Sequence, residues 1–499
     1  MKLPVVAIVG RPNVGKSTLF NALTKTRSAL VIDQPGVTRD RQYGRAEIED
    51  YGYIIIDTGG LSGEAEGIEA VMAEQVKLAI SESDLILFVV DAKEGLHIQD
   101  VAIANFLRQQ HKNIIILVNK ADGHSEDLVL ADFYELGFET ILPLSAAHRR
   151  GVTDLVLTHI LPLCQAMNPE IEAQNILKAE LENSLEEALE DGLENSLEKK
   201  LDSKLYEKPS EIKIAIIGRP NVGKSTLVNR LLGEDRVIVY DMPGTTRDSI
   251  YVPFERRDQK YILIDTAGLR KRGRVEAVVE KFSVVKTLQA IADSHVVINL
   301  LDAQEGVTDQ DLHVLGFALE SGRAMVIGIN KWDGLSEDQK NQVKEALDRR
   351  FDFVKHVRVH FISAKHGTGV GNLYESIHEA YDAAFKRIST GQLNRALESA
   401  TTAVQPPIKN ARRIKLRYAH MGGHNPPLIM IHGNQTDQLP ESYKRYLINH
   451  FREMFNLRGT PLRLEFKNSD NPYKDKYKKL TPRQERTQKR LDKRKGIKK

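Results

Sequence analysis

The decapeptide Gly10-Arg11-Pro12-Asn13-Val14-Gly15-Lys16-Ser17-Thr18-Leu19 occurs again as Gly218-Arg219-Pro220-Asn221-Val222-Gly223-Lys224-Ser225-Thr226-Leu227. Each copy follows a short β-branched run, Val5–Val9 or Ile212–Ile217, and precedes apolar residues at helical spacing. A strand, a glycine-rich turn and a helix form the phosphate-binding loop G-x-x-x-x-G-K-[ST], in which backbone N–H groups and the helix N-terminus surround phosphate oxygens. The sequence therefore predicts two phosphate sites, with every residue from Gly to Thr of each copy in contact with nucleotide.

The repeat extends well beyond these loops. Four further motifs recur in the same order and at a nearly constant separation, which changes only between motifs, as small loop insertions would produce. We infer a tandem duplication of a whole domain. The pairs are Pro35–Asp40 with Pro243–Asp248, Ile56–Leu61 with Ile264–Leu269, Asn119–Asp122 with Asn330–Asp333, and Ser145-Ala146 with Ser363-Ala364.

Within each copy, continuous apolar runs alternate with longer segments of helical spacing. This alternation predicts an α/β domain with a mostly parallel sheet that is covered by helices on both faces. The expected strands are Tyr53–Ile56, Leu85–Val90, Asn113–Val118, Tyr261–Ile264, His295–Leu300 and Ala324–Ile329, and the expected helices include Ile68–Ile80 and Val275–Ala292.

The motifs favour guanine nucleotides and Mg²⁺. The lysine of each loop can neutralise the β- and γ-phosphates, and the serine that follows can bind Mg²⁺. The carboxylates of Asp122 and Asp333 can accept the N1–H and N2–H₂ groups of guanine, whereas adenine would leave them unpaired. The base site is completed in the first copy by Asn119, Lys120, Ser145 and Ala146, and in the second by Asn330, Lys331, Ser363 and Ala364.

Two glycine-containing turns are expected to respond to the γ-phosphate. Asp57 and Asp265 end buried strands and are placed to hold Mg²⁺ through water, while Thr38 and Thr246 are candidate metal ligands in the switch loops. The amides of Gly60 and Gly268 are expected to sense the γ-phosphate. Thr58, Gly59, Thr266 and Ala267 complete the predicted nucleotide contacts.

The usual water-positioning glutamine is absent, because Leu61 and Leu269 follow the Asp-x-x-Gly motifs. Asn13 and Asn221 are the candidates for holding K⁺, which would place positive charge between phosphate oxygens as an arginine finger does. The alternative is that they only brace the loop. Arg39 and Arg247 are either internal arginine fingers or members of ordinary loop salt bridges.

Composition limits the class of protein. The chain has 499 residues, 41% of them hydrophobic, and one cysteine, which excludes an internal disulfide framework and suits the cytoplasm. We find no signal peptide and no apolar stretch of the ~18 residues that would span a bilayer. The net charge of +3 conceals an acidic centre and a basic C-terminal end.

Five regions make up the predicted organisation of the chain. The first G domain is expected over 1–168, an acidic linker with leucine at every fourth position over 169–210, and the second G domain over 211–390. A third unit over 391–472 contains expected strands at Arg412–Tyr418, Pro427–His432 and Leu462–Phe466 and a helix at Tyr443–Phe455. Residues 473–499 form a basic tail that is expected to be disordered when free.

With these motifs in place, the chain resembles the Der (EngA) family of bacterial GTPases, which have two consecutive G domains and a C-terminal KH-like domain. The resemblance implies GTP hydrolysis with Mg²⁺, stimulation by K⁺, and a role in maturation of the large (50S) ribosomal subunit. It also implies a movement of the first G domain against the KH-like domain. The third unit lacks the Gly-x-x-Gly loop of RNA-gripping KH domains, and Met421-Gly422-Gly423-His424 is its nearest approach. It is therefore expected to bind protein or rRNA by another surface.

Two alternatives remain at the level of sequence. The chain could be a membrane- or protein-linked GTP-dependent switch, although its tail lacks the interleaved apolar residues that enter a bilayer interface. One G domain could also bind GTP only as a scaffold. We expect a cytoplasmic, ribosome-associated monomer that binds GTP and GDP, contacts rRNA and ribosomal proteins, and has no stable membrane association.

Overall fold

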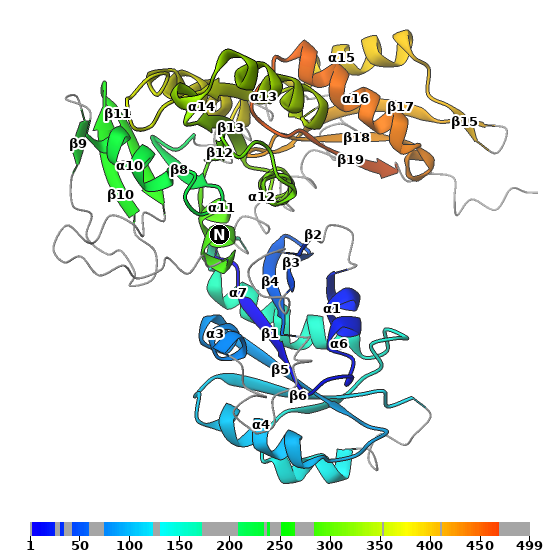
Figure 1. The fold of residues 1–499 in the computed structure, drawn as a ribbon. Coiled ribbons are helices and arrows are strands. Elements are labelled where there is room, and N and C mark those ends of the chain that lie inside the picture. The colour runs from blue at the N-terminus through cyan, green and yellow to red at the C-terminus, as the bar shows by residue number, and fades with distance from the viewer. Residues whose placement is uncertain are drawn as a thin grey trace, which may run out of the picture. The chain divides into compact units, whose positions relative to one another are not determined.

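The structure is a computed structural model that describes residues 2–24, 30–33, 42–58, 74–122, 130–171, 208–233, 237–239, 251–264, 284–351, 354–409 and 412–468. Chain contacts divide it into two compact units. The larger unit holds both G domains together with the short segments His424–Pro427 and Asn456–Pro461. The smaller unit comprises the rest of the chain from Arg387 onward, and the elements of both units are labelled in Figure 1.

The first G domain is built on a seven-stranded sheet in the order β2-β3-β4-β1-β5-β6-β7. Strands β4, β1, β5, β6 and β7 run parallel, and β2 and β3 add an antiparallel edge. The predicted mostly parallel sheet is thus confirmed. The strands are β1 Val5–Val9, β2 Leu30–Asp33, β3 Gln42–Ile48, β4 Tyr51–Asp57, β5 Leu85–Asp91, β6 Asn113–Asn119 and β7 Ile141–Pro143.

Helices cover both faces of this sheet. Leu19, Leu23 and Ile160 belong to one buried cluster, whereas Ile80 and Leu107 belong to another on the opposite face. One face carries α1 Lys16–Thr24, α6 Val152–Leu155, the π-helical turn η2 Val156–Ile160 and α7 Leu161–Met167; the other carries α3 Glu74–Glu82, α4 Ile98–Arg108 and the 3₁₀ turn η1 Asp132–Leu136.

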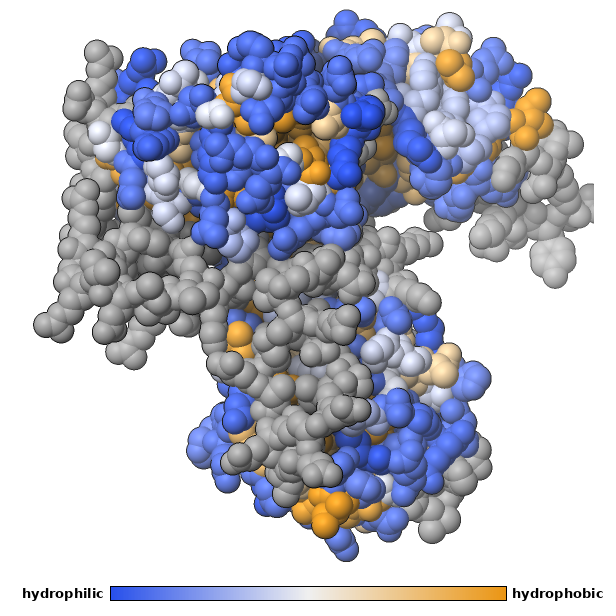
Figure 2. Space-filling view, viewed as in Figure 1, coloured by the Kyte–Doolittle hydropathy of each residue, from blue (hydrophilic) through white to orange (hydrophobic). Residues whose placement is uncertain are grey.

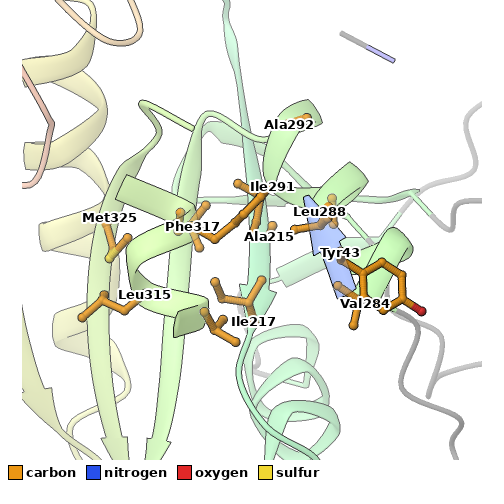
Figure 3. Close-up of a cluster of buried hydrophobic side chains, with 14 of the residues drawn as sticks. Tyr43, Ala215, Ile217, Val284, Leu288, Ile291, Ala292, Leu315, Phe317 and Met325 are labelled. Atoms are coloured by element: carbon orange, nitrogen blue, oxygen red, sulfur yellow. The ribbon is translucent and has the colours of Figure 1, made fainter. Parts of the chain in front are cut away.

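The second G domain repeats this architecture in the strand order β14-β13-β12-β8-β11-β10-β9. The side chains of Ile217, Leu288, Ile291 and Phe317 meet in one of its buried clusters (Figure 3). Its elements are β8 Glu211–Ile217, α10 Lys224–Leu232, β9 Val237–Val239, β10 Tyr251–Arg256, β11 Gln259–Ile264, α11 Val284–Asp293, β12 Val296–Asp302, α12 Asp309–Glu320, β13 Ala324–Asn330, η4 Trp332–Gly334, α13 Glu337–Arg350, β14 Arg358–Phe361 and α14 Gly371–Ala384.

The smaller unit is an α+β fold with a three-stranded sheet in the order β17-β18-β19. Strand β18 pairs antiparallel with β17 and parallel with β19. Helix α15 was not expected from sequence, and β17 extends further toward the C-terminus than predicted. The elements are α15 Thr390–Ala403, β15 Ile408–Lys409, β16 Arg412–Arg413, β17 Lys415–Gly423, β18 Leu428–Asn434, η6 Thr436–Gln438, α16 Glu441–Met454 and β19 Arg463–Asn468.

Hydrophilic side chains cover most of the described surface in the view of Figure 2. Large apolar side chains that are exposed include Ile98 on α4 and Tyr134 on η1. Across the described residues, every helix is too short or too polar to cross a membrane.

Candidate nucleotide sites

Each phosphate loop joins the central strand of its sheet to the first helix, so both open at the carboxyl edge of the parallel strands. The first glycine of each loop lies against a neighbouring strand. A Cβ on Gly10 would lie 2.3 Å from the carbonyl oxygen of Val89, and one on Gly218 would lie 2.3 Å from that of Leu300. Real Cβ atoms do not approach an oxygen so closely, and glycine is therefore required at both positions.

The loop lysine is buried in the first domain. Lys16 is 7% exposed, and its Nζ donates to the carbonyl oxygen of Arg11 at 2.7 Å. Burial lowers the pKa of Lys16 to about 8, although the charge of Asp57 opposes the shift. A bound polyphosphate would favour the charged form. Lys224 Nζ makes the same contact with the carbonyl oxygen of Arg219, at 2.8 Å.

Two hard oxygen ligands lie together beside the first loop. Ser17 Oγ donates to Asp57 Oδ2 at 2.7 Å, and Asp57 is 2% exposed at the end of β4. Hydroxyl and carboxylate oxygens suit Mg²⁺. When the ion is bound it would neutralise phosphate charge, with Ser17 as a ligand and Asp57 as a ligand or a partner of its water. Ser225 is exposed at the equivalent place in the second domain.

An asparagine at the end of β6 connects the base site to the phosphate loop. Asn119 Nδ2 donates to the carbonyl oxygen of Val14 at 2.8 Å, and Asn119 Oδ1 accepts from the N–H of Ala146 at 3.0 Å. Because Gly15 has φ +98 and a Cβ there would lie 2.2 Å from Asn119 Nδ2, a larger residue is excluded. In the second domain Asn330 makes the same two hydrogen bonds, to Val222 and from Ala364, both at 2.8 Å.

The carboxylates predicted to bind guanine lie beside their serine partners. Ser145 Oγ donates to Asp122 Oδ2 at 2.8 Å. A hydrogen bond from Ser363 is the main cause that lowers the pKa of Asp333, and His366 Nε2 lies 3.2 Å from Asp333 Oδ2. Asp122 and Ser145 also line a cavity of about 300 Å³ together with Pro143.

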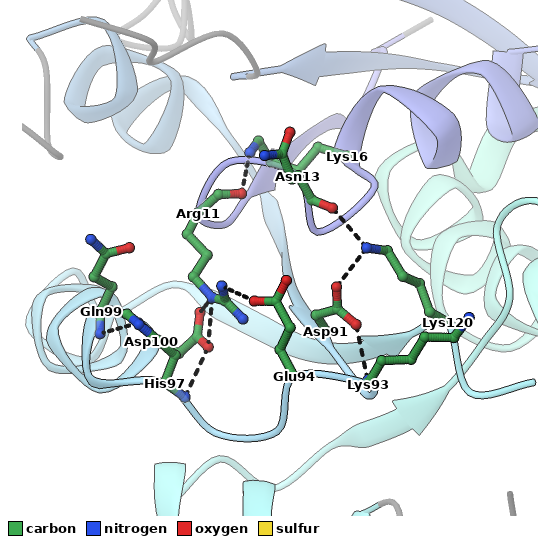
Figure 4. A network of polar contacts seen from close by, with 10 residues as sticks. All are labelled: Arg11, Asn13, Lys16, Asp91, Lys93, Glu94, His97, Gln99, Asp100 and Lys120. Carbon is green, nitrogen blue, oxygen red and sulfur yellow. Dashed lines mark hydrogen bonds and ion pairs between the residues drawn. The ribbon is translucent and has the colours of Figure 1, made fainter. Parts of the chain in front are cut away.

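The lysine of the first Asn-Lys-x-Asp motif points back to the phosphate loop (Figure 4). Lys120 Nζ donates to the carbonyl oxygen of Asn13 at 2.9 Å and to Asp91 Oδ2 at 2.6 Å. Lys331 Nζ likewise lies 2.5 Å from Asp302 Oδ2. The structure therefore brings the Asn-Lys-x-Asp and phosphate-loop motifs together in both domains.

The asparagines proposed for K⁺ share one conformation. Asn13 has φ 65 and Asn221 has φ 63, in the left-handed region, and both residues are exposed. Within the described residues we find no hydrogen-bond partner for either side-chain amide.

Other predicted residues have different surroundings. Thr58 is 3% exposed and its hydroxyl donates to the carbonyl oxygen of Ile8 at 2.7 Å, so this side chain is committed to the fold. Pro12, Thr18, Pro220 and Thr226 are not buried. The predictions for Thr38, Arg39, Gly59, Gly60, Leu61, Thr246, Arg247, Asp265, Thr266, Ala267, Gly268 and Leu269 lie outside the described residues.

The sequence motifs did not predict the ion pairs that the phosphate-loop arginines make. Arg11 binds the acidic residues Glu94 and Asp100, which follow β5 and begin α4 (Figure 4). Arg219 binds Glu305 and Asp311 in the same way. The signal was present in the repeat, because Asp91-Ala92-Lys93-Glu94-Gly95 recurs as Asp302-Ala303-Gln304-Glu305-Gly306.

The fold and paired motifs define a protein with two P-loop G domains. The family described as "50S ribosome-binding GTPase" matches residues 5–120 and 213–331, and the "KH-domain-like of EngA bacterial GTPase enzymes, C-terminal" matches residues 387–467. GTPase Der of Klebsiella pneumoniae subsp. pneumoniae is 55% identical, covering 98% of each chain, and GTPase Der of Pectobacterium carotovorum subsp. carotovorum matches to the same extent. Among solved structures, Era of Aquifex aeolicus bound to GDP.AlF4- has a TM-score of 0.27 and 35% identity, covering 32% of this chain and 56% of its own.

The chain belongs to the GTPase Der family. It is accordingly an enzyme that binds GTP and hydrolyses it to GDP and phosphate. The prediction of two tandem G domains followed by a KH-like domain is confirmed.

Proposed function

We propose that the chain acts in the cytoplasm in maturation of the large (50S) ribosomal subunit, by binding rRNA and ribosomal proteins in a GTP-dependent manner. The observation that carries this proposal is the complete domain order, two G domains followed by a KH-like unit, at 55% identity to GTPase Der over 98% of the chain. The description of the family that matches both G domains, "50S ribosome-binding GTPase", supports the same partner.

Charge at the C-terminal end supports contact with RNA. Arg413, Lys415 and Arg417 alternate along β16 and β17, and all three are exposed. Residues 474–499 contain thirteen Lys or Arg and three Asp or Glu. Each phosphate contact made by such residues releases counterions, which gives a salt-dependent and sequence-independent affinity. The KH-like unit and the tail together therefore supply the rRNA-binding surface.

We also propose the site residues predicted from sequence as the GTP, Mg²⁺ and K⁺ sites of this enzyme. In each domain the phosphate loop and the Asn-Lys-x-Asp motif bind nucleotide, and Ser17 and Ser225 bind Mg²⁺. Asn13 and Asn221 hold K⁺, and the ion supplies the positive charge that an arginine finger provides elsewhere. Their exposed amides, one on each phosphate loop, support this role.

The test is co-sedimentation of the full-length chain with purified 50S, 30S and 70S particles and with anionic liposomes, in the presence of GDP or a non-hydrolysable GTP analogue. We expect binding to 50S particles that depends on the nucleotide, and none to liposomes. Depletion of the protein from cells should accumulate immature large subunits in sedimentation profiles. Binding to liposomes alone would instead support a membrane-linked switch.

A truncation of residues 473–499 separates the tail from the rest. A matched control replaces the same residues with an uncharged Gly/Ser segment of equal length. Both changes should flatten the slope of log affinity for 50S particles against log salt and leave intrinsic GTP hydrolysis unchanged. An unaltered slope would show that the tail does not touch RNA.

A further inference from the structure

The arginine of each phosphate loop makes the same contacts in both domains. Arg11 Nε lies 3.1 and 3.0 Å from the two carboxylate oxygens of Asp100, and Arg11 Nη1 lies 2.6 Å from Glu94 Oε2. The contacts join the phosphate loop to the N-terminus of α4. In the second domain, Arg219 Nε lies 2.8 Å from Asp311 Oδ1 and Arg219 Nη1 lies 2.7 Å from Glu305 Oε2.

The ion pair is withdrawn from water. The side chain of Arg11 is 8% exposed and that of Asp100 is 0% exposed, while Glu94 is 54% exposed. Burial opposes ionisation, but the hydrogen bonds and charges of the two carboxylates outweigh it and raise the pKa of Arg11. Loss of Arg11 would leave the buried charge of Asp100 uncompensated, whereas loss of Asp100 would leave Arg11 paired with the half-exposed Glu94 alone.

The carboxylate of Asp100 also caps the N-terminus of its own helix, α4. Asp100 Oδ2 accepts from the N–H of His97 at 3.3 Å, closing a capping box at the start of α4. Asp311 accepts from the N–H and the hydroxyl of Thr308 at 3.0 and 2.8 Å. The arginine is thus attached to a rigid helix terminus.

The guanidinium is turned away from the phosphate-binding groups. Figure 4 shows it directed toward Asp100 and Glu94, on the side of the loop opposite to Lys16 and Asn13. The main chain of Arg11, however, is part of the phosphate loop, and its carbonyl oxygen accepts a hydrogen bond from Lys16 Nζ at 2.7 Å. Two residues later Asn13 has φ 65, in the left-handed region that asparagine adopts more readily than most residues.

We propose that Arg11 and Arg219 are positioning residues for GTP hydrolysis. The side chain of each anchors the phosphate loop to the helix that follows the next strand, and the main chain of the same residue then holds the catalytic lysine and the left-handed asparagine in place. The anchor of each arginine also includes its two acidic partners, Asp100 and Glu94 in the first domain and Asp311 and Glu305 in the second. The inference rests on GTP hydrolysis at the proposed phosphate loops, so failure of the ribosome or potassium proposals leaves it intact.

The experiment uses the full-length chain with one site silenced. In a Lys224→Ala background, Arg11→Lys, Asp100→Asn and the double variant are compared with Arg45→Lys. Arg45 pairs with Glu47 at 3.0 Å on β3, within the same domain, and serves as the matched arginine control. The measurements are bound GTP per chain, single-turnover hydrolysis of that bound GTP, and thermal unfolding. The mirror series in a Lys16→Ala background uses Arg219→Lys and Asp311→Asn.

We expect Arg11→Lys and Asp100→Asn each to lower the hydrolysis rate per bound nucleotide by about 10- to 100-fold, the loss typical of a misplaced catalytic group. The double variant should lose no more than either single variant, since both break one contact. Arg45→Lys should hydrolyse at the parent rate.

Two results would overturn the proposal. One is a lowered unfolding temperature with an unchanged rate per bound nucleotide, which would make the ion pair a helix anchor only. The other is that the rate losses of Arg11→Lys and Asp100→Asn multiply in the double variant. That result would mean that Arg11 acts through contacts other than its ion pair with Asp100. Should Asp100→Asn fail to fold, Glu94→Gln provides the test. Glu94 is the half-exposed partner of Arg11, and its charge can be removed while the buried Arg11–Asp100 pair stays intact. An unchanged rate in that variant and in Arg11→Lys would also overturn it.

Discussion

The two G domains share their sheet order and phosphate loops, but they differ at the opposite end of the central strand. In the first domain the N–H of Val5 donates to Asp84 Oδ2 at 2.8 Å. In the second domain the N–H of Lys213 donates to His295 Nδ1 at 3.2 Å. The two copies therefore share the contacts within the proposed nucleotide sites but differ in the side chain that accepts a hydrogen bond from the central strand, Asp84 in one and His295 in the other.

A second difference lies beside the base site. Ala121 and Pro143 line the cavity next to Asp122 in the first domain. In the second domain Trp332 and Phe361 occupy the corresponding sequence positions, with ring centroids 4.2 Å apart. The aspartate that is proposed to bind guanine is thus the same in the two domains, whereas the side chains beside it differ.

The largest expected effect tests whether both base sites read guanine in the same way. Asp122→Asn and Asp333→Asn should each shift their own site from guanine to xanthine nucleotides, by ~10⁴-fold or more in relative affinity, because a carbonyl replaces the amine that the carboxylate binds. Asn can still accept from Ser145 or Ser363, so the loop should stay folded. Competition binding with GDP and XDP measures the shift. A double variant that still prefers GDP would refute the assignment.

The next effect tests the difference at the central strand. Burial lowers the pKa of His295 from 6.5 to about 4, so the unfolded chain takes up this proton first as the pH falls. The contribution of neutral His295 to the free energy of unfolding is complete above pH 6.5. It declines as the pH falls toward 4, by about 1 kcal/mol at pH 5.5 and up to about 3 kcal/mol at pH 4.

Amide hydrogen exchange in the full-length chain can resolve this effect. Between pH 7.5 and 5.5, protection corrected for intrinsic exchange should fall in β8 more than in β1. His295→Asn keeps an acceptor for the N–H of Lys213 and does not titrate, so it should remove the difference. Equal loss of protection in both strands, or no rescue by Asn, would show that His295 is not its source.

The last effect concerns what the domains share. Because neither Asp-x-x-Gly motif is followed by glutamine, replacing Na⁺ with K⁺ should raise hydrolysis at least ~10-fold, part of the 10³–10⁵ that an arginine finger supplies. Asn13→Ala in the Lys224→Ala background, and Asn221→Ala in the Lys16→Ala background, should each abolish the response. Equal turnover in the two salts would end the potassium proposal.

Sequence alone predicted the elements whose pattern is strong. Buried parallel strands such as β6 and β13 are continuous apolar runs, and the Asn-Lys-x-Asp motifs begin at their ends. The antiparallel edge was not predicted, because β3 reads Gln-Tyr-Gly-Arg-Ala-Glu-Ile and β10 is only partly buried. Helix α15 was missed because its buried stripe of Leu393, Ala396, Leu397 and Ala400 is half alanine.

The nucleotide motifs were predictable for a local reason: each is a short run whose chemistry is read from adjacent residues. The ion pair of Arg11 with Asp100 is not local, since 89 residues separate the partners and only the sheet order brings them together. The same holds for His295 and Lys213, which are 82 residues apart. Contacts of this kind require the topology. The arginine pair leaves one trace in the sequence, because its residues recur in both copies.

The central claim is that both copies are guanine-nucleotide sites. Equilibrium titration of the full-length chain with fluorescent GDP and Mg²⁺ tests it most directly, alongside Lys16→Ala, Lys224→Ala and the double variant. We expect two GDP per chain, one in each single variant and none in the double variant. One GDP per native chain, lost completely in one of the single variants and retained in the other, would contradict the claim.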